Sequence, residues 1–376
     1  IHQSELKLVR HCVTFEIEAP EDCREIKEGV CRNTQYSAQI QYQLRSLPSS
    51  CSSSSSSSCG ILSTCYHLIM IERVILLTIV FLWGMIRLIR KLMWRSVPWL
   101  AAGKLVVITG ASAGIGKSLA LEYARQGARL VLAARRENEL RKVAKLCENL
   151  SPLNLDVTIV KCDVSIEEDC KNLMDTAGAL HNGRIDAIFL NAGISMGELF
   201  EDVKDVSIFR RLMDVNYHGC VYCTYYALPY LKKSEHGKIV VISSLAGKGP
   251  LPTRSGYSAS KYALHGFFDS LRIELSEKYP IDVTLICPGL VQTDINRTRL
   301  GSNPEQLDMN QGMTVSEATQ IIALKTLNGV REEVFTLPGK IGQYIRFFIP
   351  ELYDTIVRRK FAAMQQKKQD GDKKDE

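Results

Sequence analysis

From Leu105 onward, short apolar runs alternate with longer amphipathic stretches, and this rhythm constrains the fold more than any other feature. The apolar runs are 105–109, 129–133, 157–161, 187–190, 238–242 and 283–287. The stretches with helical spacing between and after them are 116–126, 137–149, 166–181, 209–231 and 257–278. Strands that alternate with helices form a parallel sheet covered on both faces. Because such crossovers are right-handed, the pattern predicts one doubly wound α/β domain of the Rossmann type over 103–340.

Composition excludes several other classes of protein. The formal net charge is only +6, from 47 lysines and arginines against 41 acidic residues, and this argues against a nucleic-acid-binding protein. A hydrophobic content of 45% is enough for a core and excludes global disorder. The 12 cysteines are too thinly spread for a small disulfide scaffold.

Residues 1–69 differ from the rest of the chain. Residues 1–60 show no sustained period of a strand or helix, and positions 49–58 are all serine except Cys51. Such a run has few apolar side chains with which to offset the entropy of ordering. We therefore expect 1–69 to be a disordered leader, or upstream sequence that does not belong to the natural protein.

The segment 70–95 is predicted to be a membrane anchor. Its centre, 74–86, carries no charge, and extension to 68–89 reaches the roughly 20 residues that a span needs. A buried core helix and a cleaved signal peptide are the alternatives. The basic residues Arg87, Arg90, Lys91 and Arg95 follow the apolar centre, so the positive-inside rule predicts a single-pass anchor with the following domain in the cytosol.

The carboxyl-terminal segment 341–376 combines an apolar stretch with a basic amphipathic run and a charged tail. It is too short to span a bilayer, so we expect a helix on the membrane surface or a substrate entrance lip, with a helix packed on its own core as the alternative. The tail contains Lys373 and Lys374, which resemble a dilysine retrieval signal of the endoplasmic reticulum or form a solvated charged end.

A glycine-rich turn follows the first predicted strand in the sequence TGASAGIG. Gly110 permits a tight turn, Gly114 lets a pyrophosphate approach the backbone, and Gly116 lets the helix pack on the sheet. The helix amino terminus then faces the phosphates, with Ser112 and Ile115 in the same turn. Because the turn lies between a strand and a helix, it predicts a dinucleotide site.

The second predicted strand ends in Ala134, Arg135 and Arg136. A site for NAD requires an acidic residue near this position for the ribose 2′-hydroxyl, and none is present. Alanine leaves space, whereas the two arginines supply positive charge for a 2′-phosphate. We therefore predict NADP(H) as the cofactor.

Ser244, Tyr257 and Lys261 have a spacing that suits catalysis. Tyr257 and Lys261 are four residues apart on one predicted helix, so their side chains face the same way. An ammonium beside a tyrosine favours the phenolate, which allows proton exchange with a carbonyl or alcohol oxygen. Ser244 follows a strand at the carboxyl edge of the sheet, where its hydroxyl can hold the substrate oxygen.

Six motifs in the same order resemble those of the short-chain dehydrogenase/reductase family. They are TGASAGIG, NAG at 191–193, MDVNYHG around Asn216, ISSLAG around Ser244, YSASK at 257–261 and PGLVQT at 288–293. The resemblance covers about 103–340. It departs at Leu190, where the family often has another asparagine.

The resemblance implies further roles for individual residues. Asn216 would complete a catalytic tetrad by holding a water molecule that links Lys261 to solvent. Asp163 would contact the adenine, Asn191 would stabilise the central strand, and Thr293 would bind the nicotinamide carboxamide. The remaining cofactor contacts that it implies are Val164, Ala192, Gly193, Pro288 and Gly289.

Within that family the chain resembles the membrane-anchored member-7 group, the 7B type above all, and the 11-beta-hydroxysteroid dehydrogenases. This implies a lipophilic carbonyl or alcohol substrate: a steroid, a retinoid, or an acyl- or alkyl-dihydroxyacetone phosphate. Arg254, three residues before Tyr257, is a candidate contact for an anionic substrate group, with a structural salt bridge as the alternative. An epimerase or dehydratase of the family and a non-catalytic NADP-binding scaffold are the rival functions.

Two further expectations concern metals and assembly. Cys220 and Cys223 have no partner pair at zinc spacing, so we predict buried helix cysteines and no metal site. The long predicted helices that follow Phe209 and Tyr257 are the expected contacts of a homo-oligomer.

Overall fold

The computed structural model describes residues 70–71, 73–85, 100–153, 157–296, 299–301 and 312–372. The chain divides into two compact units, Ile1–Met93 and Trp94–Glu376. In the first unit, the described residues between 70 and 85 are helical and expose their apolar side chains. None of the helices in these described ranges is both long and apolar enough to cross a bilayer. The predictions for 1–69, for 86–95 and for the terminal lysines concern residues outside these ranges.

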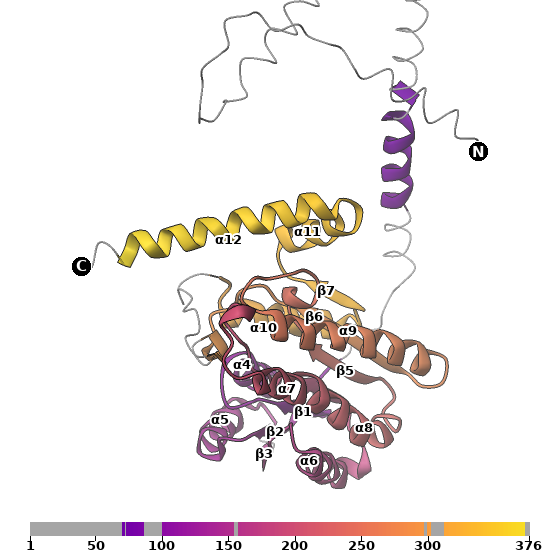
Figure 1. Cartoon of the computed structure of the whole chain (residues 1–376). Helices are drawn as coiled ribbons and strands as arrows, with labels where there is room; N and C mark the ends of the chain where they lie inside the picture. Colours follow the sequence, from indigo (N-terminus) through magenta and orange to yellow (C-terminus); the bar gives the residue numbers. More distant parts are fainter. Residues whose placement is uncertain are drawn as a thin grey trace, which may run out of the picture. The chain divides into compact units, whose positions relative to one another are not determined.

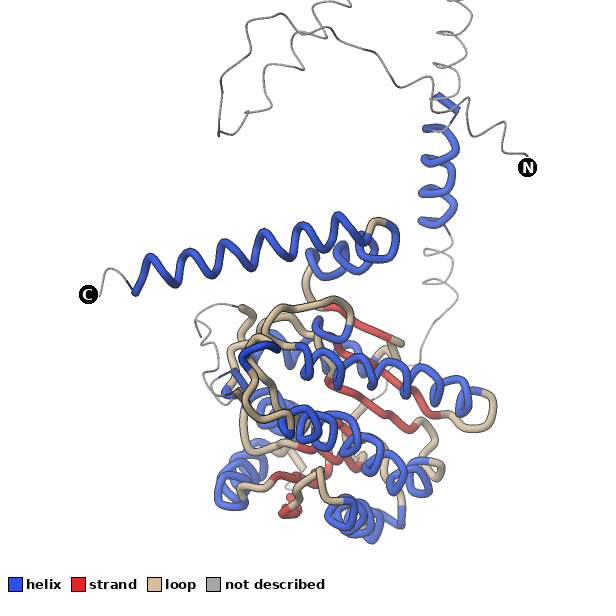
Figure 2. Tube along the Cα trace, viewed as in Figure 1, coloured by secondary structure: helices blue, strands red, loops and turns tan. Residues whose placement is uncertain are grey.

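The second unit is built on a seven-stranded parallel sheet with the strand order β3-β2-β1-β4-β5-β6-β7 (Figures 1 and 2). This order reverses beside β1, so the predicted doubly wound parallel sheet is confirmed. The strands are β1 (Leu105–Thr109), β2 (Arg129–Ala134), β3 (Val157–Lys161), β4 (Ala187–Leu190), β5 (Gly237–Ile242), β6 (Ile281–Cys287) and β7 (Glu332–Val334).

Helices cover both faces of the sheet. The helices of the unit are α4 (Gly114–Arg125), α5 (Glu137–Leu150), α6 (Glu167–Ala179), α7 (Ser207–Met213), α8 (Gly219–Leu231), α9 (Ser255–Ser276), α10 (Val315–Leu327), α11 (Leu337–Phe348) and α12 (Pro350–Asp372). One apolar layer packs the sheet against α6, α8 and α9, and the other packs it against α4, α5 and α10.

Strand β1 shows why the sequence forms these two layers. Leu105 and Val107 belong to one layer, whereas Val106 and Ile108 belong to the other. Successive side chains of a strand point to opposite faces, so a strand covered on both sides is apolar at every position. The run LVVIT therefore has no polar alternation because neither of its faces meets water.

Two elements were not expected from the sequence, and one was divided. Helix α10 was missed although Thr314 and Glu317 form a capping box at its start. Strand β7 has no usable pattern because it is only three residues long and reads EEV. The predicted helix 209–231 consists of α7 and α8 joined by a π-helical turn, Asp214–His218. The boundary expected after residue 340 falls inside α11, which begins at Leu337.

Candidate active site

A cleft of about 1140 Å³ opens at the carboxyl ends of the strands. This is the edge of an open α/β sheet where ligands bind. Of the cofactor, catalytic and substrate residues predicted from the sequence, all line this cleft except Gly116 and Asn216. Both of these are buried directly behind its wall.

The glycine-rich turn has the close approaches that its sequence predicts. Gly110 has a φ of 65°, and a Cβ there would lie 2.9 Å from the Cα of Ala192. A Cβ at Gly116 would lie 2.4 Å from the carbonyl oxygen of Gly110 and 2.5 Å from Nδ2 of Asn191. Only glycine fits at these positions without a shift of the backbone around them.

The amino terminus of α4 is suited to an anion. Its N-cap residue, Ala113, has no side chain that can accept from the first helical amides, and the first turn contains no acidic residue. Gly114 and Ile115 bring these amides to the cleft wall. The unneutralised positive end of the helix therefore fits the diphosphate of a dinucleotide.

Asn191 fastens the central strand to the glycine turn. Its Nδ2 donates to the carbonyl oxygens of Thr109, at 3.0 Å, and Gly110, at 3.3 Å. Its backbone amide donates to Oγ1 of Thr109, also at 3.0 Å. The end of β4 and the end of β1 are thus held together where the cofactor would lie.

The two arginines after β2 have different partners. A terminal nitrogen of Arg136 donates to Oγ of Ser112 at 3.1 Å, which places its guanidinium beside the glycine turn. Arg135 instead lies 3.7 Å from the carboxylate of Asp163, the residue expected near the adenine. Asp163 also accepts from the hydroxyl of Ser165 at 2.7 Å.

Tyr257 and Lys261 occupy one face of α9, as their spacing predicts. Both are buried, with 7% and 4% of their surfaces exposed. Nζ of Lys261 donates to the carbonyl oxygen of Ile242, at the end of β5, at 2.8 Å. The same nitrogen lies 5.7 Å from the centre of the Tyr257 ring, so a positive charge stands close to the phenol.

Ser244 begins a short 3₁₀ turn, Leu245–Gly247, directly after β5. Its Oγ accepts from the amide of Ala246 at 3.1 Å. The hydroxyl is therefore both a turn cap and a group that lines the cleft, and its proton stays available for a substrate oxygen.

Asn216 lies in the π-helical turn between α7 and α8. Its Oδ1 accepts from the amide of Ile194 at 2.8 Å, and its Nδ2 donates to Oγ of Ser260 at 2.9 Å. A Cβ at Gly193 would lie 3.1 Å from Oδ1 of Asn216 and 3.7 Å from Nζ of Lys261. The structure thus brings Asn216 and Lys261 to the same glycine, and the water that Asn216 is expected to hold stays a prediction.

The outer wall of the cleft comes from α11 and α12. One face of α12 reaches the cleft with side chains spaced three or four residues apart: Tyr353, Ile356, Val357, Lys360, Phe361 and Met364. None of the residues of α11 is buried. This arrangement supports the entrance lip expected for this segment rather than a helix packed on its own core.

Tyr353 and Arg254 complete the rim. The Tyr353 ring packs so closely on Gly249 that a Cβ there would lie 2.1 Å from its hydroxyl oxygen. Arg254 is the N-cap residue of α9, and its carbonyl accepts from the amide of Ser258 at 2.8 Å. Tyr353 was not among the residues expected at the cleft, although its spacing to Val357 and Phe361 on an amphipathic run was a usable signal.

The predicted helix cysteines are buried. Cys220 and Cys223 belong to the layer between the sheet and α8, where Cys170 of α6 also packs. Burial raises the pKa of the Cys220 thiol to about 11. These side chains therefore act as small apolar groups of the core.

The fold and the cleft together define a dinucleotide-dependent oxidoreductase, and comparisons with known proteins agree. The family model for short chain dehydrogenase matches residues 104–303. The chain therefore belongs to the short-chain dehydrogenase/reductase family, as the motifs predicted.

Curated relatives and a solved structure are similar to this chain. The chain is 39% identical to a dehydrogenase/reductase SDR family protein 7-like of Dictyostelium discoideum, over 70% of this chain and 84% of that protein. It is 46% identical to 11-beta-hydroxysteroid dehydrogenase-like 2 of Arabidopsis thaliana, over 68% and 80%. An alcohol dehydrogenase from the archaeon Thermococcus sibiricus, complexed with 5-hydroxy-NADP, superposes with a TM-score of 0.54 at 26% identity, covering 61% of this chain and 94% of that one.

Proposed function

We propose that this protein is an NADP(H)-dependent enzyme that reduces a lipophilic carbonyl or oxidises the matching alcohol. One observation carries the proposal. A single cleft joins the glycine turn to Ser244, Tyr257 and Lys261, and its far wall is the apolar face of α12. A cofactor, a proton donor and an apolar substrate can therefore meet in it.

The residues of the chain supply the proton transfer and the orientation. The bound nicotinamide would supply or accept the hydride. The hydroxyl of Ser244 donates a hydrogen bond to the substrate oxygen and holds that oxygen beside Tyr257. The phenol of Tyr257 gives a proton to that oxygen during reduction and takes one back during oxidation. The buried ammonium of Lys261 favours the negative phenolate that remains.

The environment of Arg136 supports NADP(H) over NAD(H). Its guanidinium and the Ser112 hydroxyl stand together beside the glycine turn, and Ala134 leaves room next to them. These are the groups that a ribose 2′-phosphate needs. Arg135 is paired with Asp163 and is the weaker candidate for this contact.

The size and polarity of the outer cleft support a substrate with a large apolar body. The α12 face offers isoleucine, valine, phenylalanine and methionine side chains. Several relatives bear the name 11-beta-hydroxysteroid dehydrogenase, which favours a molecule of steroid size. A family epimerase would use the same cofactor without net turnover of NADPH, and a scaffold would not need Ser244, Tyr257 and Lys261 in one cleft.

The test is a screen of lipophilic carbonyls, followed by NADPH absorbance, with the full chain in detergent. We expect turnover of a steroid ketone, retinal or a long-chain ketone with NADPH. Arg136→Ala should weaken NADPH binding about tenfold, because a charge-assisted bond to phosphate is lost, and leave NADH binding unchanged. Arg135→Ala is the matched control and should have the smaller effect. Equal loss for both cofactors in Arg136→Ala would contradict the cofactor assignment.

A second candidate, an acyl- or alkyl-dihydroxyacetone phosphate reductase, is favoured by the place of Arg254 on the cleft wall. An arginine there would bind a phosphate in bidentate fashion. Arg254→Ala should then raise KM for acyl-dihydroxyacetone phosphate about tenfold and leave that of a neutral ketone unchanged. An equal rise for both substrates would leave the steroid-like class ahead.

We also propose attachment to the membrane of the endoplasmic reticulum, with the active site in the cytosol. The proposal is supported by apolar side chains exposed on α11 and at its end: Leu337, Ile341, Phe347, Phe348 and Ile349. Such a surface suits the interface of a bilayer. Resistance of the full chain to alkaline extraction from microsomes, with protease access from the cytosolic side, is the expected result. Release by alkali would contradict the anchor.

The chain is further proposed to form a homo-oligomer through α8 and α9. Tyr225 of α8 and Ile273 of α9 are both strongly exposed apolar side chains on these helices. Paired helices of two copies would bury them in a self-complementary contact. Light scattering of the detergent-purified chain should give a dimer or tetramer, and Ile273→Glu should convert it to a monomer.

A further inference from the structure

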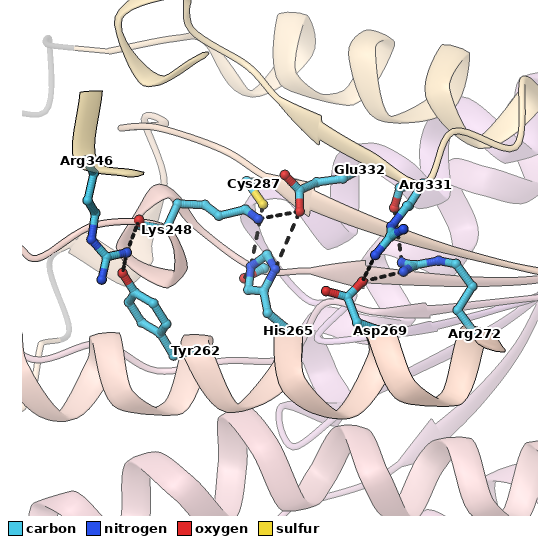
Figure 3. A network of polar contacts seen from close by, with 10 residues as sticks. Lys248, Tyr262, His265, Asp269, Arg272, Cys287, Arg331, Glu332 and Arg346 are labelled. Atoms are coloured by element: carbon cyan, nitrogen blue, oxygen red, sulfur yellow. Dashed lines mark hydrogen bonds and ion pairs between the residues drawn. The ribbon is translucent and has the colours of Figure 1, made fainter. Parts of the chain in front are cut away.

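A buried histidine lies behind the catalytic serine, and the mechanism above does not use it. His265 lies on α9 one turn after Lys261 and two turns after Tyr257, on the same face of the helix. Only 8% of its surface is exposed. Figure 3 shows its ring with the side chains of Lys248, Cys287 and Glu332 around it.

The ring contacts residues at the ends of β5 and β6, the strands that lead into the active-site loops. Nε2 lies 3.0 Å from Oγ of Ser243, the residue between β5 and Ser244. The same nitrogen lies 3.7 Å from Sγ of Cys287, the last residue of β6. Cys287 directly precedes Pro288, whose carbonyl accepts from the amide of Leu245 at 2.9 Å.

The ring also supports the far end of the turn that begins at Ser244. A Cβ at Gly247 would lie 3.0 Å from Nε2 and Cδ2 of the ring, so the backbone passes directly over it. The next residue, Lys248, places its ammonium 2.5 Å from the carboxylate of Glu332 on β7. That carboxylate lies 3.6 Å from Nδ1 of His265. Both ends of the turn are therefore held around one imidazole.

We propose that His265 is a positioning residue that holds the turn 244–248, and with it the Ser244 hydroxyl, in the orientation that binds the substrate oxygen. This role rests on the proposed carbonyl chemistry at Ser244. His265 does not touch the reacting atoms, and it acts through Ser243 on one side and Gly247 on the other.

The chemistry of the ring suits this role. Burial lowers the pKa of His265 to about 4, so the imidazole is neutral near pH 7. Nδ1 faces a carboxylate, which only accepts hydrogen bonds, so the ring proton belongs on Nδ1. Nε2 is then an acceptor for the hydroxyl of Ser243. The neutral ring thus accepts from Ser243 at Nε2, whereas Nδ1 has no hydrogen-bond partner among the described residues and lies 3.6 Å from the Glu332 carboxylate.

Three side chains of this cluster are potential metal ligands, with ligand atoms within 4.8 Å of one another: His265, Cys287 and Glu332. The Lys248 ammonium, however, already supplies a positive charge to Glu332. Burial raises the pKa of the Cys287 thiol, which disfavours the thiolate that a metal needs. We therefore interpret the cluster as a hydrogen-bonded and ion-paired support of the turn.

A double-mutant cycle tests this role, with decanal and NADPH as the assay. Ser244→Ala and His265→Leu should each lower kcat about tenfold or more and leave NADPH affinity within about twofold. In the double variant, His265→Leu should add less than about twofold to the loss caused by Ser244→Ala, because the serine through which it acts is gone. His265→Gln, which keeps an amide near the place of Nε2, should recover most of the kcat.

Two outcomes of this cycle would overturn the proposal. One is a fold-loss of kcat in the double variant that equals the product of the fold-losses in the two single variants. The other is activity that a chelator abolishes and Zn²⁺ restores, which would make the cluster a metal site. Leu264→Ala changes a fully buried neighbour on α9 and controls for lost stability. Any loss of kcat that it causes should be the same in the presence and in the absence of the Ser244 hydroxyl.

Hydrogen exchange gives a readout that does not depend on turnover. The amide of Ala246 donates to Oγ of Ser244 and that of Gly247 to its carbonyl. Both amides should exchange at least about tenfold faster in His265→Leu than in wild type and Leu264→Ala. If wild type does not reduce decanal, the proposed function fails on that substrate while this exchange still decides the positioning role. Unchanged exchange in His265→Leu would overturn it.

Discussion

The cofactor half and the substrate half of the cleft are built in different ways. The cofactor half consists of strand ends and the turn at Gly110, with buried residues and backbone approaches that leave no room for a side chain. The proposed substrate half is formed largely by α11 and α12, whose residues from 337 to 366 are exposed or half-buried. In Figure 1 these two helices lie beyond β7, the last strand of the sheet.

The attachment of α11 shows the same difference. Arg346 donates to the carbonyl oxygen of Lys248 and to the hydroxyl of Tyr262, and these contacts appear at one side of Figure 3. Tyr353 of α12 adds the packing on Gly249. Polar and packing contacts at single residues, among them the ion pair of Lys340 with Glu333, thus hold the α11 and α12 wall, whereas two apolar layers hold the cofactor half. Under the proposed function, chemistry would rest on the part held by the two apolar layers, and substrate choice would rest on a helical pair that can vary without disturbing it.

The largest effect is expected where the two halves meet. Tyr257→Phe removes only the proton-transfer group, so kcat should fall by roughly 10²- to 10⁴-fold. NADPH affinity, measured by fluorescence, and the KM of the ketone should stay within about twofold of wild type. Turnover within a few-fold of wild type would remove Tyr257 from the mechanism.

A substitution in the cofactor half should have the next largest effect. Gly116→Ala places a methyl group 2.4 Å from the carbonyl oxygen of Gly110. Overpacking of this kind costs about 1–3 kcal/mol, so NADPH should bind roughly 10- to 100-fold more weakly and the protein should unfold at lower denaturant. Gly266→Ala on α9, where a Cβ meets nothing within 4 Å, is the matched control. Equal behaviour of the two variants would contradict the packing argument.

A substitution in the substrate half should affect only the substrate. Phe361→Ala shortens the apolar wall and should raise KM of a steroid ketone by about fivefold, the equivalent of about 1 kcal/mol. NADPH affinity should not change. Arg359→Ala, on the other side of the same helix, is the control and should leave KM as it is. A change of NADPH affinity in Phe361→Ala would mean that the two halves are coupled.

The smallest effect is expected in the free energy of unfolding at low pH. The pKa of His265 is lowered to about 4 by burial, against about 6.5 in an unfolded chain. The unfolded state therefore binds the proton first, so stability falls as pH decreases from about 6.5 to 4 and is unaffected by this group above that window. The slope should be roughly 1 kcal/mol per pH unit in urea unfolding, and smaller in His265→Gln. Parallel slopes for the two proteins would show that His265 does not titrate on unfolding.

Local patterns in the sequence were enough for the architecture of the cofactor half. Continuous apolar runs predicted six of the strands, since a strand buried on both faces is apolar at each position. The glycine spacing predicted close approaches that the structure contains at Gly110 and Gly116. The i to i+4 spacing placed Tyr257 and Lys261 on one face of α9, because that relation holds within any helix.

Other features depended on contacts between distant parts of the chain. Strand β7 has only three residues, and its edge position rests on pairing with β6. The different partners of Arg135 and Arg136 follow from the positions of Asp163 and Ser112, which no local pattern relates to them. The π-helical turn at Asn216 is likewise fixed by bonds to Ile194 and Ser260.

By itself, the sequence determined the parallel sheet, the glycine-rich turn and the place of Tyr257 and Lys261 on one face of α9, because periodicity and spacing act within a few residues. Only the tertiary structure decided that the face of α12 lines the cleft and that His265 lies under the Ser244 turn. Those arrangements bring together segments up to about a hundred residues apart, where the free energy of packing and of polar pairing, rather than local preference, selects the neighbour.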